Sequence, residues 1–255
     1  IHDSYACRRG KGTLAALYRA QHFARGHRHV LPIDIRAFFP SMDHAILMGA
    51  LRRHLGDTRV IDLCTAILAG GEDVFAEEPG PGLFPGDDLF ALTRPRGLPI
   101  GNLTSQFWAN VFLHPLDLYI KQDLRCRAYL RYCDDLLLFA DDKRELQANL
   151  IAIRDRLAAM RLAIHEDRAQ VSPVATGFSF VGWRVFPDRL RLRRRNVVRF
   201  WRRYRQRIEA YAAGGIDVDR LHATVMGWVG FTRHGSTIGL RRAVLRQPIR
   251  RTPRG

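Results

Sequence analysis

Short apolar runs broken by acidic residues stand out in the middle of the chain. Residues 128–130 and 136–140 are apolar and flank Asp134 and Asp135, which predicts a β-hairpin with these two acids at its tight turn. Residues 29–35 form another short, β-branched run, and it contains Asp34. Because a carboxylate is rarely buried without a partner, we expect a function for Asp34. If its strand lies beside the hairpin, Asp34 and Asp134 face each other.

Helical periodicity covers much of the remaining chain. We expect Ser41 to cap the second of these helices, with Asp43 and His44 as capping residues rather than ligands, and Asp217 to cap the last. Trp108 and Phe112, one turn apart, are expected in the core. The predicted helices cover residues 14–24, 42–55, 59–69, 103–120, 143–160 and 218–231. Residues 70–96, rich in Gly, Pro and scattered acids, are interpreted as an irregular loop without catalysis.

The acids themselves indicate a cation. Two adjacent carboxylates raise each other's pKa and lose hydration when buried, so a positive charge stabilises such a pair. Oxygen ligands suit Mg²⁺, and two carboxylates that face each other could hold two ions about 3.5–4 Å apart, the arrangement used for displacement at phosphorus. The alternative is a solvated Asp-Asp turn without a metal.

Three motifs resemble those of reverse transcriptases. Asp34 with Phe38 and Phe39 is similar to motif A, residues 97–106 (GLPIGNLTSQ) to motif B, and residues 132–135 (YCDD) to the Tyr-x-Asp-Asp motif. Their order and spacing agree with the family over nearly the whole chain. The form Ile-Gly-Asn-Leu-Thr-Ser-Gln most resembles reverse transcriptases of diversity-generating retroelements of bacteria and phages.

The resemblance implies an α+β, right-hand polymerase fold. Residues 1–30 would be the C-terminal part of the fingers, residues 31–186 a palm with an antiparallel sheet and helices, and residues 187–255 a basic helical thumb. The implied activity is RNA-directed DNA synthesis by two-metal nucleotidyl transfer, with Mn²⁺ as a substitute for Mg²⁺.

The resemblance also implies site residues. Asp34, Asp134 and Asp135 would be catalytic, and these three with the carbonyl of Ile35 would hold the ions. The nucleotide-binding residues would be Phe39 as the steric gate under the sugar, Ile100, Gly101, Ser105, Gln106 and, as a phosphate contact, Arg168. The nucleic-acid contacts would be Arg8, Arg9, Lys11, Tyr132, Trp183 in the primer-grip strand pair over residues 178–185, Arg194, Arg195, Arg199, Arg202 and Arg203.

One position departs from the family pattern. Ile100 stands where most reverse transcriptases have Gln. The loss of an amide that helps to position the nucleotide puts ordinary fidelity in doubt, and this fits the error-prone copying of the retroelement group.

The positive charge of the chain is concentrated near its C-terminus. The net charge is +16, and residues 187–255 contain 18 Arg against 4 acids, whereas residues 1–186 are nearly balanced. Ten arginines lie between Arg189 and Arg207 without an acid, while Val197, Trp201, Tyr204, Ile208 and Tyr211 recur at helical spacing. We interpret residues 188–211 as a helix with one packed face and one face for nucleic acid, rather than as a solvated face, in which acids would alternate with the arginines.

The remaining composition limits the alternatives. Hydrophobic residues make up 47% and charged residues 26% of the 255 residues, which is typical of a folded chain. No apolar run approaches the roughly 20 residues that span a bilayer, the four cysteines show no zinc-like spacing, and we expect a cytoplasmic protein without membrane contact. The chain begins with Ile1 and is expected to be a fragment.

Expected partners are an RNA template, a DNA/RNA primer duplex, dNTPs and a small basic accessory protein. Two other functions remain open: a reverse transcriptase of antiphage defence or of another retroelement, and a non-catalytic, maturase-like RNA-binding protein.

Overall fold

The computed structural model describes residues 1–71, 82–99 and 101–246. Contacts between residues divide the chain into two compact units, Ile1–Val174 and Ala175–Gly255. The predicted division into residues 1–30, 31–186 and 187–255 stays a prediction. Ile100 lies outside the described residues.

The first unit is built on a four-stranded antiparallel sheet with the strand order β2-β3-β1-β4. Its strands are β1 (His29–Asp34), β2 (Tyr129–Tyr132), β3 (Asp135–Ala140) and β4 (Ser172–Pro173). β1 pairs with β3 along its whole length, from His29 opposite Ala140 to Asp34 opposite Asp135. The Asp34 strand therefore lies beside the hairpin, as predicted.

The turn of the hairpin lies one residue earlier than expected. Tyr132 pairs with Asp135, so the two-residue turn is Cys133-Asp134 and not Asp134-Asp135. Cys133 has a φ of 57°, in the left-handed region that two-residue hairpin turns require and that a residue with a Cβ adopts at a cost. Asp135 is consequently a strand residue.

Residues ahead of the first helix add a short extended segment to the edge of this sheet. The Tyr5 N–H donates to the Arg131 carbonyl, and the Arg131 N–H donates to the Asp3 carbonyl, both at 2.9 Å. This places Ser4 in a parallel bridge with Arg131. The outer side of β2 is thereby paired at Arg131.

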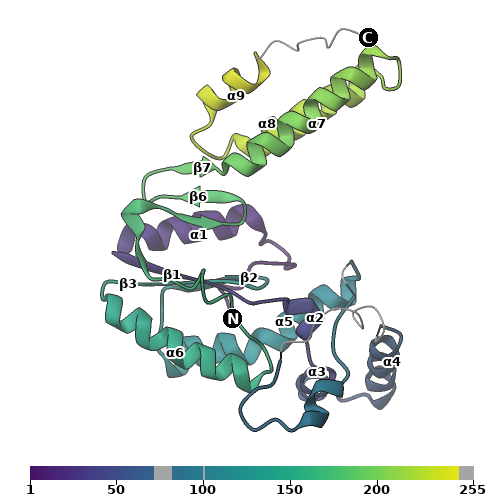
Figure 1. Cartoon of the computed structure of the whole chain (residues 1–255), viewed down its shortest axis with the longest axis vertical. Coiled ribbons are helices and arrows are strands. Elements are labelled where there is room, and N and C mark those ends of the chain that lie inside the picture. Colours follow the sequence, from purple (N-terminus) through teal and green to yellow (C-terminus); the bar gives the residue numbers. More distant parts are fainter. Residues whose placement is uncertain (72–81, 100, 247–255) are drawn as a thin grey trace. The chain divides into compact units, whose positions relative to one another are not determined.

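Helices cover both faces of the sheet. Figure 1 shows α1 (Thr13–Gly26) on one face and α6 (Lys143–Ala159) on the other. The ring of Phe23 in α1 lies 5.7 Å from that of Phe139 in β3. The predicted apolar face of α6 is confirmed at Leu146, Ile153 and Leu157, which are all fully buried. The other α-helices described in the unit are α2 (Phe38–Ser41), α3 (His44–Arg52), α4 (Thr58–Ala69) and α5 (Leu103–Leu118). Helix α5 continues as the π-helical segment η3 (Tyr119–Asp123). Two 3₁₀ segments are η2 (Leu89–Thr93) and η4 (Val174–Thr176), and η4 crosses the boundary between the units.

The helix expected over residues 42–55 is shorter and has another cap. Ser41 ends the one-turn helix α2, and α3 begins at His44 with Asp43 as its N-cap, whose carboxylate accepts from the Ile46 N–H at 3.0 Å. A carboxylate at this position also interacts favourably with the helix dipole. Trp108 and Phe112 are buried in the core, as predicted.

In its described part, residues 175–246, the second unit combines a small sheet with three α-helices. Its antiparallel strands are β5 (Phe178–Phe180), β6 (Trp183–Val185) and β7 (Leu190–Leu192), and its helices are α7 (Arg194–Ala212), α8 (Val218–Thr232) and α9 (Ile238–Leu245). Two predictions are corrected. The basic segment begins as strand β7, and the buried residue of α7 is Phe200, stacked on Trp228 at 4.1 Å, whereas Tyr211 is exposed.

Asp217 caps α8 as predicted, because its carboxylate accepts from the Arg220 N–H at 2.8 Å. Within the described residues, no helix is both long enough and apolar enough to cross a membrane.

Candidate active site

The three predicted catalytic acids lie together at one end of the β1–β3 ladder. Asp34 ends β1 and is the direct cross-strand partner of Asp135, the first residue of β3. Asp134 occupies the adjoining turn, and its carbonyl accepts from the Ile35 N–H at 3.3 Å. Cross-strand partners have their Cβ atoms about 4.5–5.5 Å apart, and like charges in such a pair repel each other. The fold thus concentrates negative charge at this point.

The pKa of Asp134 reflects its burial more than this crowding. Burial, and to a smaller extent the nearby charge of Asp34, raise the pKa of Asp134 above its ordinary value of 3.8, although a hydrogen bond from the Cys133 thiol acts in the opposite direction. Burial and the charge of Asp134 raise the pKa of the Cys133 thiol to about 12. Cys133 therefore stays a neutral donor at physiological pH.

The raised pKa of Asp134 carries a prediction for stability. A carboxyl whose pKa is higher in the folded than in the unfolded state destabilises the fold once the pH exceeds its folded-state pKa, and this cost disappears as the pH falls toward 3.8. Asp134→Asn should therefore stabilise the metal-free protein at pH 7, by on the order of 1 kcal/mol, the usual size for such active-site replacements. The midpoint of thermal unfolding in EDTA should rise by about 2–4 °C.

The control for this measurement is Asp155→Asn on the exposed side of α6, which should leave the midpoint unchanged. A lower midpoint for Asp134→Asn at pH 7, or a gain that persists at pH 4, would contradict the assigned cause.

A guanidinium lies against the first of the acids. Arg168 Nη1 donates to Asp34 Oδ2 in a short ion pair. The backbone brings them together, because the His165 N–H donates to the Asp34 carbonyl at 2.9 Å and the Arg168 N–H donates to the His165 carbonyl at 3.0 Å. Arg168 was predicted as a phosphate contact, and its pairing with Asp34 was not foreseen. Nothing in the sequence near either residue signals this pairing, which depends on the bridge between Ile35 and Ile164.

The donor atoms at this site suit a hard divalent cation. The carboxylates of Asp34 and Asp134 offer only oxygen, and Mg²⁺ is usually held by one or two protein carboxylates together with substrate phosphates and water. A cation would also offset the cost of burying the charged Asp134 carboxylate, which is the main cause of its raised pKa, and its smaller repulsion by Asp34. In the described part of the chain, no three His, Cys, Asp or Glu side chains converge closely enough to form a metal site by themselves.

The predicted steric gate, Phe39, is attached to the motif B loop. The Leu98 N–H donates to the Phe39 carbonyl, and the Gly97 N–H donates to the Met42 carbonyl, both at 2.9 Å. The Phe39 ring is partly buried and lies 5.3 Å from that of Phe38. The structure thus joins two motifs that are far apart in the sequence.

The other motif B residues differ in exposure. Gly101 has a φ of 111°, a conformation that favours glycine, and it is exposed. Ser105 is buried and Gln106 is exposed in the first turn of α5. Their contacts with a nucleotide stay predictions, as does the role of Ile100.

The predicted contacts in the N-terminal loop already have partners. Arg8 donates to the carbonyls of Ile1 and Ser4 at 2.5 and 3.1 Å, and Lys11 donates to the carbonyl of His2 at 2.8 Å. Arg9 is exposed. These bonds stabilise the loop itself, and contact with nucleic acid stays a prediction.

The two aromatic residues predicted to contact nucleic acid lie in different environments. The Tyr132 hydroxyl lies 3.0 Å from the Thr13 hydroxyl of α1 and is only partly buried. Trp183 is fully buried, and its ring lies 5.3 Å from that of Phe231. Trp183 therefore packs inside the second unit, and its contact with a primer stays a prediction.

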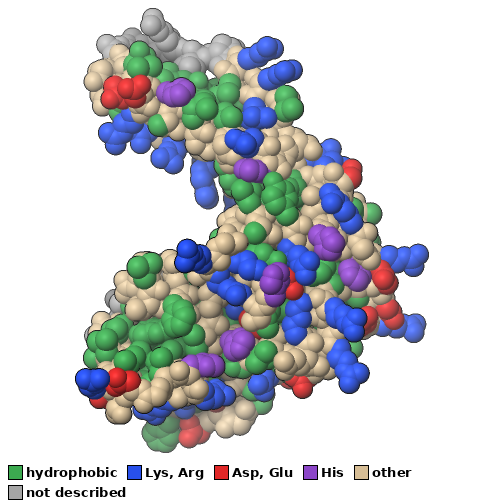
Figure 2. All heavy atoms as spheres, turned by 180° about the vertical axis from the view of Figure 1, so that it is seen from behind, with side chains coloured by type: hydrophobic (Ala, Val, Ile, Leu, Met, Phe, Trp, Pro, Cys, Tyr) green, Lys and Arg blue, Asp and Glu red, His purple; other side chains and the backbone are tan. Residues whose placement is uncertain are grey.

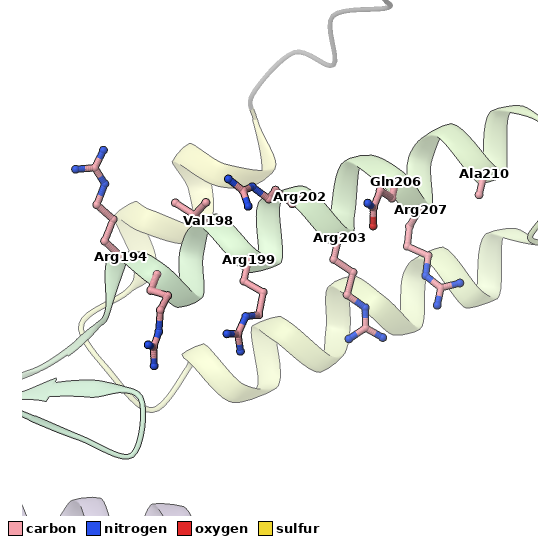
Figure 3. A pocket seen from close by; sticks show the side chains of 9 residues that line it. Arg194, Val198, Arg199, Arg202, Arg203, Gln206, Arg207 and Ala210 are labelled. Atoms are coloured by element: carbon pink, nitrogen blue, oxygen red, sulfur yellow. The ribbon is translucent and has the colours of Figure 1, made fainter. Parts of the chain in front are cut away.

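The arginines of α7 form a continuous exposed face. Figure 3 shows Arg194 and Arg202 projecting above α7 in this view and Arg199 and Arg203 projecting below it, and Arg195 lines the same groove. All five arginines are exposed, and none forms an ion pair within residues 175–246. Figure 2 shows many basic and few acidic side chains on this unit. The face is suited to bind a polyanion.

Comparisons with known proteins agree with this arrangement. Residues 1–185 match the family described as reverse transcriptase (RNA-dependent DNA polymerase). Protein YkfC of Escherichia coli (strain K12) is 25% identical over 208 residues, which are 67% of this chain and 50% of YkfC. The structure of telomerase from Candida albicans, in complex with a TWJ fragment of telomeric RNA, matches with a TM-score of 0.51 at 11% identity, over 88% of this chain and 43% of the telomerase chain. The chain thus spans about half the length of the curated relative that it matches.

The fold follows from these observations together. The telomerase match, at 11% identity, concerns the fold alone. The antiparallel sheet, its helices on both faces and this match support the predicted α+β, right-hand polymerase fold. With the acids of two of its motifs side by side and the family match covering most of its length, the chain belongs to the reverse transcriptase family.

Proposed function

We propose that the protein is an RNA-directed DNA polymerase that makes cDNA from an RNA template in a diversity-generating retroelement. The observation that carries the proposal is the meeting of Asp34, Asp134 and Asp135 at one end of the β1–β3 ladder in a chain of this family. Its substrates are dNTPs, an RNA template and a DNA/RNA primer duplex, and a small basic accessory protein is a further partner.

Each side chain at the site has a role in this proposal. Asp34 and Asp134, with the Ile35 carbonyl, hold two Mg²⁺ or Mn²⁺ ions, and Asp135 supports them. When bound, such ions would lower the pKa of the primer 3′-hydroxyl and neutralise negative charge on the triphosphate. Arg168 is exposed enough to leave Asp34 and contact a phosphate. Phe39, held by the Leu98 N–H, lies under the sugar and disfavours a 2′-hydroxyl.

The basic face of α7 supports binding of the duplex by its phosphates. Arginines without acidic partners neutralise phosphate charge, and such contacts fix position without reading sequence. The diversity-generating subgroup is supported by residues 100–106 (IGNLTSQ) and by Ile100 in particular.

The experiment that tests the proposal uses the full-length protein with a labelled primer on an RNA template, with Mg²⁺ or Mn²⁺ and each dNTP supplied singly. Templated extension is the expected result. RNA binding without extension, with the accessory protein supplied, would overturn the enzymatic proposal in favour of a maturase-like binding protein. Accurate extension would keep the polymerase and overturn the subgroup, which points to a defence system or another retroelement.

Ile100→Gln tests the subgroup directly. We expect this variant to misincorporate less often opposite template adenine, by up to roughly tenfold. A tenfold change corresponds to the free energy that one additional hydrogen bond from the glutamine amide would contribute. The measurement is the ratio of kcat/KM for incorrect and correct dNTP, and Ile100→Leu is the matched control. An unchanged ratio would exclude Ile100 as a determinant of fidelity.

A further inference from the structure

A fully buried arginine lies directly before the Tyr-x-Asp-Asp motif. Arg131 and Asp117 are each only 1% exposed. Arg131 Nε donates to Asp117 Oδ1 and Nη2 donates to Asp117 Oδ2, both at 2.8 Å. The two side chains therefore form a bidentate ion pair inside the first unit, and the burial of both partners fixes its geometry.

The third nitrogen of the same guanidinium reaches the catalytic turn. Arg131 Nη1 donates to the Cys133 carbonyl at 3.0 Å and to Asn110 Oδ1 at 3.2 Å. Cys133 is the left-handed residue of the turn and immediately precedes Asp134. A hydrogen bond to its carbonyl therefore fixes the orientation of the peptide group that links Cys133 to Asp134.

Helix α5 provides the anchor for this arginine. Asn110 and Asp117 are two turns apart and project from one face of α5. Asp117 also accepts from the Tyr129 hydroxyl at 2.7 Å, and Asn110 donates to the Ala6 carbonyl at 3.1 Å. The turn is thus connected to the helix that follows the motif B loop.

We infer that Arg131 is a positioning residue, anchored by Asp117, that holds the Cys133-Asp134 turn so that the Asp134 carboxylate faces Asp34. This inference rests on the proposed function. A buried ion pair alone is weak evidence for a contribution to stability. What identifies a positioning role is the bond from Arg131 to the Cys133 carbonyl, which only a planar group with several donors can form while it also binds Asp117 bidentately.

The test compares Arg131→Lys with Tyr129→Phe in the full-length protein. Lysine keeps the charge that Asp117 needs, but its single ammonium cannot also hold the Cys133 carbonyl and Asn110. Tyr129→Phe removes another hydrogen bond to Asp117 and leaves the turn untouched. Both variants should unfold at a lower temperature than the wild type.

Only Arg131→Lys should lose kcat, by about 100-fold, the cost of a small misplacement of a catalytic group. The KM for dNTP should change little in either variant. Equal kcat values for the two variants would overturn the inference, because a merely structural pair would affect both alike.

Hydrogen exchange of residues 132–136 provides a measurement independent of polymerase activity. The amides of the turn should exchange faster in Arg131→Lys than in Tyr129→Phe, whereas those of α6 should be unchanged. If the wild-type protein extends no primer, the proposed function fails, and exchange still decides whether Arg131 fixes the turn. Equal exchange in both variants would refute the positioning role.

Discussion

Primer extension should be lost in Asp34→Asn, with a decrease of about 10³-fold or more, since metal ions held by such carboxylates supply several kcal/mol of transition-state stabilisation. Asparagine keeps the shape of the side chain and removes the charge that pairs with Arg168 and faces Asp135. The measurement is single-nucleotide extension on an RNA template by full-length protein, together with the affinity for the primer–template duplex. Affinity should stay nearly unchanged, because the proposed contacts with the duplex come from the arginines of α7.

Asp167→Asn is the matched control for this substitution. Asp167 is also a carboxylate neighbour of Arg168, with 3.9 Å between Arg168 Nε and Asp167 Oδ2, but it lies outside the acidic cluster. Its variant should extend primers at nearly the wild-type rate. Extension by Asp34→Asn at a similar rate would contradict the assignment of Asp34 as a catalytic metal ligand.

The triple substitution of Arg199, Arg202 and Arg203 by glutamine should weaken duplex binding by about 100-fold at 0.15 M salt. The physical reason is that each lost phosphate contact removes the release of about 0.9 counterion, which favours binding. Glutamine retains good helix propensity, so α7 should stay folded. The measurement is the dissociation constant across a series of salt concentrations. The slope of log K against log salt should decrease by about 3.

The control triple is Arg52, Arg53 and Arg59 to glutamine, at the C-terminal end of α3 and in the first turn of α4. These arginines are exposed, and their removal changes the net charge by the same amount. We expect the control to leave the salt slope unchanged. Equal losses of affinity in both triples would show a general charge effect and contradict a specific face on α7.

The sequence was sufficient to predict those features that depend on local pattern and on recognisable motifs. The strand with Asp34, the hairpin and the amphipathic α6 follow from apolar periodicity, and their pairing was inferred from the chemistry that the acids require. The exact turn was missed by one residue. Cys133 adopts a left-handed conformation there, which the pattern of apolar runs does not encode.

Other features depend on contacts between distant residues and could not be predicted. Asp43 was correctly expected to be a capping residue, but Ser41 was wrongly given the N-cap position of α3. The donation from Arg94 Nε to Asp43 at 2.6 Å could not be predicted, because it requires the later loop. Phe200 was overlooked as the core of the helical unit because its importance comes from Trp228 on another helix. The pairing of Arg168 with Asp34 likewise arises only when the chain returns to β1.

Both margins of the β2-β3-β1-β4 sheet are protected from self-association. On the outer side of β2, residues 3–5 bind the N–H and the carbonyl of Arg131. The opposite margin is the two-residue strand β4, which contains Pro173 and so lacks one N–H donor. The edges of this sheet therefore leave few free N–H and C=O groups with which a strand from another molecule could pair. Shortened forms of the protein intended for crystallisation should therefore retain Asp3 to Tyr5, because their removal would leave β2 as an open edge prone to aggregation.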